Sequence, residues 1–238
     1  MTDRGILFST PMVRAILAGT KTQTRRIVKL KDHKLPLAMG YWCDGADGAG
    51  KCVDPNGPVW SFGRRVPGDP HNMYVHERVG CPYGQPGDRL WVREEHHLSG
   101  FAQEIDGRAV ADADDVDEPE IGCHYHADGA YRVVRLSKRE GRLLAARKAD
   151  RGRKMLGRFL YKSCARVWLE ITGVRVERLQ EISEGDAYAE GVTTGAYSGG
   201  DNRDGRRAFI MLWESINGPG SWAANPWVWC LNFRMVVK

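Results

Sequence analysis

The chain has 238 residues and a formal net charge of +5 at pH 7. It is long enough to bury a core, either as one domain with insertions or as two smaller domains. No apolar run approaches the roughly 18 residues of a transmembrane helix, and the start of the chain is too polar for a signal peptide, so we expect no membrane association and a cytoplasmic location. The mild basic charge is compatible with a nucleic-acid or nucleotide ligand but does not require one.

The first predicted helix covers residues 11–18. Thr10 suits the N-cap, Pro11 suits the first helical position, and Gly19 suits the C-terminal stop. A dense polar cluster follows directly, Gly19-Thr20-Lys21-Thr22-Gln23-Thr24-Arg25-Arg26. A lysine close to a hydroxyl is one way to activate a nucleophile without histidine, and two arginines suit a planar or anionic ligand. On the cluster alone, a solvated polar turn leading into a strand is the simpler interpretation.

Residues 31–80 and 98–160 are predicted to be long insertions. The first is rich in Gly, Pro, Asp and His and is expected to form a loop or flap, held to the body by Trp42, Trp60 and Phe62. The second contains an acidic block at 104–120, expected to be a solvated loop, and a basic block at 135–158, expected to be partly helical. The basic block is compatible with phosphate contacts and equally with a solubilising surface.

Six cysteines are spread along the chain without a CxxC pair. In a cytoplasmic protein this favours free thiols over disulfides. Zinc is bound by side chains of the types found at Cys123, His124 and His126 and at the earlier cysteines, but the spacing of these residues matches no standard zinc site. We therefore predict no metal and no cofactor.

Three strands and two further helices complete the prediction. The strands cover 89–94, 166–179 and 227–237, each with alternating apolar residues, and Gly173 is expected to bend the second. The helices cover 184–190, with Ser183 as N-cap and Gly191 as stop, and 206–216. A few strongly bent strands with peripheral helices indicate a small α+β barrel.

The ordered motifs resemble a known family. They are the 19–26 cluster, Pro86-Gly87-Asp88-Arg89-Leu90-Trp91-Val92-Arg93-Glu94, the segments 174–183 and 187–191, and Asn225-Pro226-Trp227-Val228-Trp229. Together they are similar to an ASCH-domain protein of the type found in phages and prophages. The resemblance covers about residues 5–30, 81–97 and 163–236. It implies a single PUA-like domain over residues 1–238, a small β-barrel of the kind that binds RNA or modified nucleosides, with the two insertions added.

The resemblance also implies an activity, since some small ASCH proteins are amidohydrolases that remove the acyl group from N(4)-acetylcytidine and related N(4)-acylated cytosines. Their proposed catalytic set maps onto Lys21, Thr24 and Glu190 of this sequence. Arg26, Trp91 and Glu94 are then expected to be substrate-binding neighbours. The alternative is a non-enzymatic reader that binds RNA or a modified nucleoside in the same cleft. The acyl group, the choice between a free nucleoside and a polymer, and the oligomeric state are left open.

The chemistry sets two conditions on that site. Thr24 would attack the acyl carbonyl, and Lys21 would have to be neutral to accept its proton, although an exposed lysine has a pKa near 10.4. A carboxylate from Glu190 beside Lys21 would raise the lysine pKa, so Glu190 fits better as the proton carrier for the leaving amine or the deacylating water. Positions 21 and 24 face opposite sides of a straight strand, so the chain must turn there for them to converge.

Overall fold

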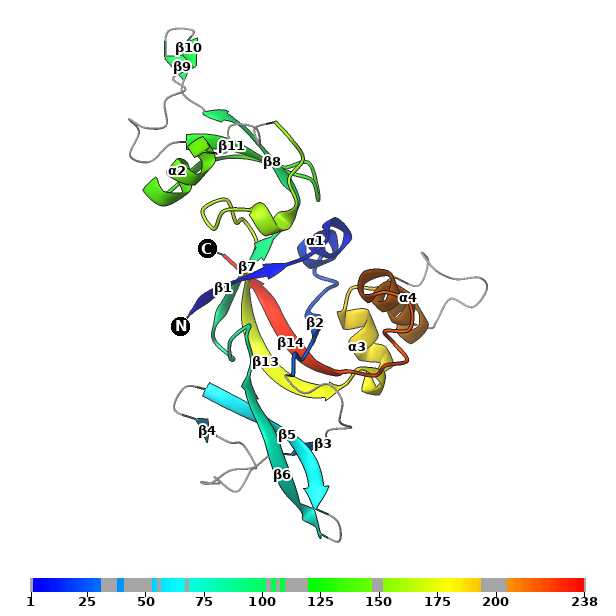
Figure 1. Cartoon of the computed structure of the whole chain (residues 1–238). Coiled ribbons are helices and arrows are strands. Elements are labelled where there is room, and N and C mark those ends of the chain that lie inside the picture. Colours follow the sequence, from blue (N-terminus) through cyan, green and yellow to red (C-terminus); the bar gives the residue numbers. More distant parts are fainter. Residues whose placement is uncertain are drawn as a thin grey trace. The chain divides into compact units, whose positions relative to one another are not determined.

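The structure is a computed structural model of the chain, and it describes residues 2–30, 38–40, 53–54, 57–66, 69–101, 104–105, 108–109, 120–146, 152–193 and 205–237. It is mixed α+β, as the sequence predicts (Figure 1). The chain divides into two compact units: Met1–Lys21, Arg89–Glu170 and Arg234–Lys238 form the first, and Thr22–Asp88 and Ile171–Phe233 form the second. The first unit includes the predicted insertion at 98–160, and the second includes the one at 31–80.

Five strands are hydrogen-bonded in the order β1 (Asp3–Leu7), β7 (Arg89–Arg93), β13 (Trp168–Arg178), β14 (Trp227–Val236) and β2 (Gln23–Ile27). β1 pairs with β7 in parallel, whereas β7 with β13 and β14 with β2 are antiparallel. The three strands predicted from alternation are thereby confirmed. The order ends at β1 and β2, so among the described strands the sheet is open and no closed barrel is found.

The first unit also contains a three-stranded antiparallel sheet. Its order is β12 (Tyr131–Arg135), β11 (Glu120–Tyr125) and β8 (His96–Phe101). Helix α2 (Lys138–Ala146) contributes Leu144 to the core beneath it, which confirms a helical part of the basic block. The other buried members of this core are Leu98, Ile121, Cys123, Tyr125, Leu136, Met155, Leu160 and Cys164. The acidic block contains two short paired strands, β9 (Glu104–Ile105) and β10 (Arg108–Ala109), so it is not entirely loop.

Helix α1 (Thr10–Leu17) lies where the sequence predicts it, but its N-cap differs. The capping position is Ser9, and its side chain makes no capping hydrogen bond. Thr10 is the first helical residue, and its hydroxyl donates instead to Glu95 Oε2 at 2.9 Å. The helix buries Val13 and Ile16, and Gly19 follows it with a φ of 73°, a conformation that glycine adopts without strain.

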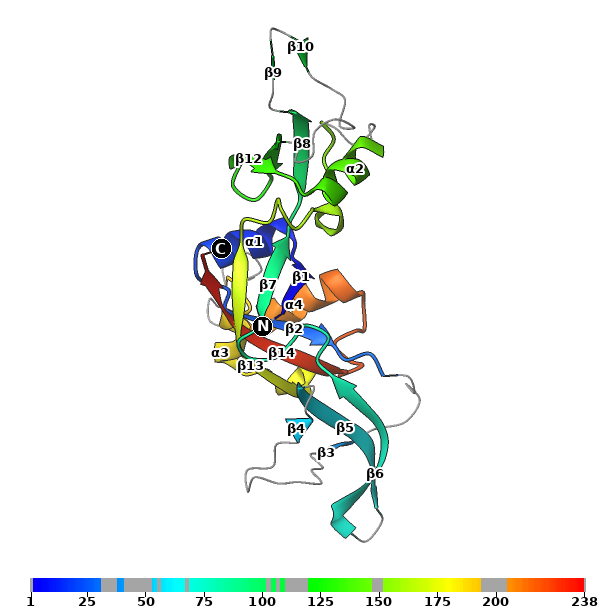
Figure 2. The same ribbon diagram turned by 90° about the vertical axis from the view of Figure 1, so that its left-hand side faces the viewer.

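The second unit contains a long hairpin where the sequence suggested a flap. Strands β5 (Gly57–Val66) and β6 (Asp69–Gly80) pair along most of their length, and β3 (Ala38–Gly40) and β4 (Val53–Asp54) pair with β5 (Figure 2). Trp60 packs edge-on against Trp229 with ring centroids 4.8 Å apart, and Phe62 packs against Trp227 at 6.0 Å. These contacts confirm two of the three predicted anchors, and Trp42 lies outside the described residues.

Helices α3 (Glu184–Ala189) and α4 (Gly205–Asn217) belong to the second unit and confirm the two later helix predictions. The Ser183 side chain accepts a hydrogen bond from the Asp186 backbone N–H at 3.1 Å, and Glu190 is the C-cap. The helices pack through Ala187, Phe209 and Trp213 in one apolar cluster with Val228 and Cys230 of β14. They therefore cover the side of the sheet on which these two β14 residues lie.

Candidate functional site

Half of the polar cluster after α1 is buried: Lys21, Gln23, Thr24 and Arg25 are buried, whereas Gly19, Thr20 and Thr22 are exposed. Side-chain alternation along β2 places Gln23 and Arg25 on one face and Thr24 on the other, yet all three are buried. The relative exposure of Thr24 is 2%, and that of Lys21 just before β2 is also 2%. A turn does lead into a strand here, as the simpler interpretation predicts, but solvation is wrong for Lys21 and for the side chains at the start of β2. The cause is tertiary: helices and neighbouring strands cover a segment whose own composition is polar.

Arg25 is the centre of a buried ionic network in the second unit. Its Nη2 lies 2.5 Å from Glu177 Oε1 and 3.2 Å from Asp186 Oδ2, and its Nη1 lies 3.2 Å from Glu190 Oε1. Nη1 also donates to Gln23 Oε1 at 2.5 Å. One guanidinium thus joins carboxylates from β13, from α3 and from the residue that caps α3, which fixes β2 against both elements.

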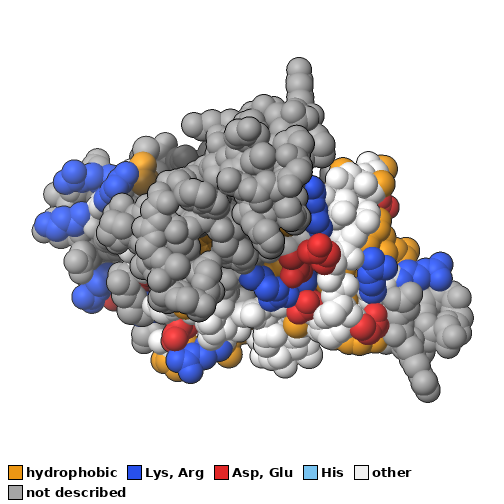
Figure 3. Space-filling view, turned by 90° about the horizontal axis from the view of Figure 1, so that it is seen from below, with side chains coloured by type: hydrophobic (Ala, Val, Ile, Leu, Met, Phe, Trp, Pro, Cys, Tyr) orange, Lys and Arg blue, Asp and Glu red, His pale blue; other side chains and the backbone are white. Residues whose placement is uncertain are grey.

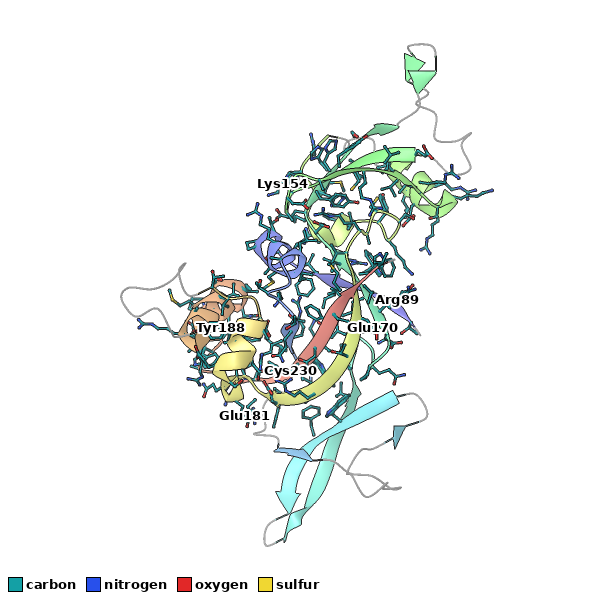
Figure 4. The ribbon with its side chains drawn as sticks, turned by 180° about the vertical axis from the view of Figure 1, so that it is seen from behind. Arg89, Lys154, Glu170, Glu181, Tyr188 and Cys230 are labelled. Carbon is teal, nitrogen blue, oxygen red and sulfur yellow. The ribbon has the colours of Figure 1, made fainter. Side chains whose placement is uncertain are left out.

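A second arginine and a thiol complete this network. Arg175 Nη2 lies 2.9 Å from Asp186 Oδ2, and its Nε lies 2.9 Å from Glu177 Oε2. Burial would raise the pKa of Glu177, but a hydrogen bond from Cys230 and the charge of Arg25 outweigh it and hold that pKa below its ordinary value. Burial raises the pKa of the Cys230 thiol, so it remains a protonated donor. Figure 4 shows Cys230 on β14 and Tyr188 on α3.

Glu190 lies at the outer edge of β2. The Thr22 backbone N–H donates to the Ala189 carbonyl oxygen at 2.8 Å, so the end of α3 runs beside the start of β2, the last strand of the sheet order. From this edge the Glu190 carboxylate binds Arg25 on one face. It also attracts Arg26 on the other face, where burial lowers the pKa of Arg26 and the charges of Tyr83 and Glu190 oppose that shift. Glu190 is 4% exposed.

Lys21 is the last residue of the first unit, directly before Thr22. Its Nζ lies 5.7 Å from the centroid of the Phe8 ring, within reach of a cation–π interaction. Contacts within the second unit bring together Glu190 and the segment that carries Thr24. The convergence of Lys21 with these two stays a prediction.

Trp91 and Glu94, two expected substrate neighbours, belong to the first unit and have structural partners there. Trp91 packs in an apolar cluster with Ala165 and Trp168. Glu94 is buried and accepts two hydrogen bonds from Arg166, both at 2.9 Å. These contacts give both side chains a packing role. Their binding role stays a prediction.

Glu177 and Asp186 were missed as members of the site. Both lie inside elements that the sequence predicts, Asp186 in the helix at 184–190 and Glu177 in the strand at 166–179. Arg175 and Glu177 stand two positions apart on β13, which places both on one face of the strand. That pattern of charges on one strand face was the available signal.

No group of three or more His, Cys, Asp or Glu side chains in the described ranges has the arrangement of a metal site. The cysteines at 81, 123, 164 and 230 are free thiols, as predicted for the described positions. On the face seen in Figure 3, acidic and basic side chains lie beside one another.

The comparisons with known proteins leave the family open. No model of a known protein family, no curated protein and no solved structure matches this chain. Among the described helices, none is long and apolar enough to cross a membrane. The ASCH resemblance therefore rests on the sequence motifs.

Proposed function

We propose that this chain is an amidohydrolase that removes the acyl group from N(4)-acylated cytidine or cytosine. The observation that carries the proposal is the burial of Lys21, Thr24 and Glu190, the three expected catalytic side chains. Burying an amine, a hydroxyl and a carboxylate is costly unless each has a defined interaction. A solvated turn would not incur that cost, so their burial supports a chemical role.

The proposed body is a single PUA-like ASCH domain, and its support is the order of the elements. Strand β1 is followed by helix α1, the polar cluster and strand β2, and later the Pro-Gly-Asp turn leads into β7. The long strand β13, α3, α4 and the tryptophan-rich β14 follow in the order that the motifs require. Closure of these strands into a barrel belongs to the proposal.

In the proposed reaction, Thr24 Oγ1 attacks the acyl carbon while Lys21 Nζ accepts the hydroxyl proton. The bond from the acyl carbon to N4 then breaks, N4 takes a proton, and the acyl group remains as an ester on Thr24. Glu190 supplies the leaving-group proton or activates the water that hydrolyses the ester to a carboxylic acid. The products are the free cytosine amine and the acid.

The Arg25 network supports this assignment of Glu190. A carboxylate near a lysine raises the lysine pKa and opposes a base role. Here the Glu190 charge is shared with Arg25, whose Nη1 lies 3.2 Å away, so its effect on a neighbouring amine is reduced. Arg25 and Arg26 follow Thr24 directly in the chain, and their positive charges favour a neutral amine in the same region.

The test measures conversion of N(4)-acetylcytidine and N(4)-benzoylcytidine to cytidine by ultraviolet absorbance and chromatography. Thr24→Val removes the nucleophile while keeping the side-chain shape, so turnover should fall by orders of magnitude. Thr20→Val is the matched control, because Thr20 is exposed and its hydroxyl donates only to the Ala15 carbonyl within the described structure. A fully active Thr24→Val enzyme would rule out Thr24 as nucleophile. A wild type that binds acetylated RNA and hydrolyses no acylcytidine would favour the reader.

A further inference from the structure

Two of the free thiols, Cys123 and Cys164, lie together in the core of the first unit. Cys123 is on β11 and Cys164 follows Leu160 in the chain, and both belong to the buried cluster beneath the three-stranded sheet, with exposures of 0% and 1%. The Cys164 thiol donates a hydrogen bond to the Cys123 sulfur. The two sulfur atoms are therefore neighbours in the folded chain, although they are far apart in the sequence.

Tyr125 fixes the backbone at Cys164 to β11. Its hydroxyl donates to the Cys164 carbonyl oxygen at 2.6 Å. Tyr125 stands two positions after Cys123, so both side chains lie on the same face of the strand. The Arg166 Cζ atom lies 4.2 Å from the centroid of the Tyr125 ring, and Arg166 is itself held by Glu94 at 2.9 Å. The position of the two thiols is thus set by contacts other than their own.

The surroundings of Cys123 favour its thiolate. The hydrogen bond from Cys164, with smaller contributions from the Tyr125 hydroxyl and the charge of Arg166, outweighs burial and the charge of Glu94 and lowers the pKa of Cys123. Burial instead raises the pKa of the Cys230 thiol. Because the thiolate is the nucleophilic form of cysteine, Cys123 should be the more reactive of these two buried residues.

A cavity of about 220 Å³ gives a small molecule access to the pair. Tyr125 and Cys164, the two residues that contact Cys123, both line it, together with Ser163, Ala165 and residues 132–135. Residues 131–133 and 135 are exposed, so the cavity opens to solvent along β12. A cavity holds a water molecule from about 10 to 15 Å³ upward, so this one has room for a molecule as small as hydrogen peroxide.

We propose that Cys123 and Cys164 form a redox-active dithiol that a small hydroperoxide converts into a disulfide. The Cys123 thiolate attacks one oxygen of hydrogen peroxide, the O–O bond breaks, and the departing hydroxide takes up the proton that Cys123 released. The Cys164 thiolate then attacks the sulfur of the resulting sulfenic acid. The S–S bond forms, the S–O bond breaks, and the second hydroxide takes up the Cys164 proton.

In sum of atoms and electrons, the two thiols are oxidised by two electrons and the peroxide is reduced to two water molecules. A small thiol such as dithiothreitol reverses the reaction by exchange. Neither cysteine belongs to the proposed catalytic set, so this proposal does not depend on hydrolysis of an acylcytidine.

The experiment treats the reduced full chain with hydrogen peroxide, blocks the remaining thiols with iodoacetamide, and maps disulfides by mass spectrometry of a non-reduced tryptic digest. The expected product is a peptide pair linked through Cys123 and Cys164, which dithiothreitol separates. Cys81→Ser is the matched control, because Cys81 is a partly exposed thiol of the second unit and its loss should leave the link at the wild-type yield. Absence of the link, or a main product that joins either residue to another cysteine, would overturn the proposal. The same yield from the chain unfolded in urea would also overturn it, because the fold would then have no part in the pairing.

The order of attack has its own readout. Cys164→Ala removes the second thiol, so sulfenic acid should accumulate on Cys123, where dimedone traps it. Cys123→Ala should leave Cys164 with little dimedone label under the same conditions. Equal labelling in the two variants would contradict first attack by Cys123, and circular dichroism of both checks that the fold persists. Disulfide mapping of the wild type tests the pairing itself without either variant.

Discussion

The Lys21 amine has two possible roles in the proposed site, a catalytic base or a fixed positive charge, and substitutions distinguish them. Lys21→Met removes the amine at similar length, and we expect turnover of N(4)-acetylcytidine to fall by orders of magnitude. Lys21→Arg keeps the charge but cannot lose a proton at neutral pH, so it should be as inactive as Lys21→Met if the amine is a base. Substantial turnover by Lys21→Arg would instead assign Lys21 to electrostatic stabilisation. Circular dichroism of both variants checks that the fold persists.

Arg25 should be the most important structural residue of the site. Arg25→Met leaves the carboxylates of Glu177, Asp186 and Glu190 without their shared guanidinium. Removing one partner of a buried ionic network costs about 3 to 5 kcal/mol of unfolding free energy.

The matched comparison for Arg25 is Arg175→Met. Arg175 contacts two of the same carboxylates, but its side chain is 36% exposed, so water compensates part of its loss. Urea denaturation of both variants measures the difference. Equal destabilisation by the two substitutions would show that the burial of Arg25 has no special energetic role.

At the residue scale, the sequence motifs led to a proposed site whose chemistry stays a prediction, but they did not predict how buried that site is. Lys21, Thr24 and Glu190 were proposed as a site through the resemblance to ASCH proteins. The burial of Lys21 and Thr24 was not predictable, because it is produced by helices and strands far away in sequence. The pairing of Arg25 with Glu177 depends on the same long-range packing, and no local pattern specifies it.

At the scale of elements, the β5–β6 hairpin should stabilise the second unit through Trp60. This side chain is 5% exposed and packs on Trp229. Trp60→Ala leaves a large cavity and should cost about 3 to 5 kcal/mol of unfolding free energy, as measured by chemical denaturation. Met211→Ala is the control, because Met211 is 44% exposed on α4 and should cost much less. A Trp60→Ala variant as stable as the control would show that packing of the hairpin through Trp60 contributes little to the free energy of unfolding of the second unit.

Helices and core strands were predictable here, whereas the hairpin was not. Helix α3 has a capping serine and a stop glycine, and β14 alternates clearly, so local signals were enough. Residues 57–80 contain Gly, Pro, Asp and His that weaken the strand pattern, and the pairing of β5 with β6 is set by cross-strand contacts. Composition therefore indicated a loop where tertiary pairing forms a hairpin.

At the scale of the whole molecule, pH should act on stability through His96 of the first unit. Its Nδ1 lies 3.1 Å from the Glu94 carbonyl oxygen, and within the described structure its buried Nε2 has no hydrogen-bond partner. Burial, with a smaller contribution from the charges of His126 and His97, lowers the pKa of His96 from 6.5 to about 4, against the hydrogen bond to Glu94. The folded protein therefore keeps this ring neutral while the unfolded chain protonates it.

The sign of the effect follows from that difference. Above pH 6.5 the His96 ring is neutral in both the folded and the unfolded state, so it does not lower the free energy of unfolding. As pH falls from 6.5 towards 4, only the unfolded chain binds the proton, so the free energy of unfolding decreases. At about 1.4 kcal/mol per pKa unit, the loss across this window is roughly 3 kcal/mol. Asp128 and Glu140 have pKa values lowered from 3.8 and 4.5, so their contributions begin to be lost only at the acidic end of the histidine window and continue to be lost below it.

Thermal unfolding of the wild type and His96→Asn between pH 7 and pH 4 tests this prediction. Asparagine keeps an N–H donor near the Nδ1 position and cannot be protonated in this range. The wild type should lose stability between about pH 6.5 and pH 4, and His96→Asn should lose less across the same window. Below pH 4 both proteins should lose stability together, because their carboxylates are the same. Parallel curves over the whole range would show that His96 is not the acid-sensitive group, and would direct attention to the neighbouring stack of His97 and His124.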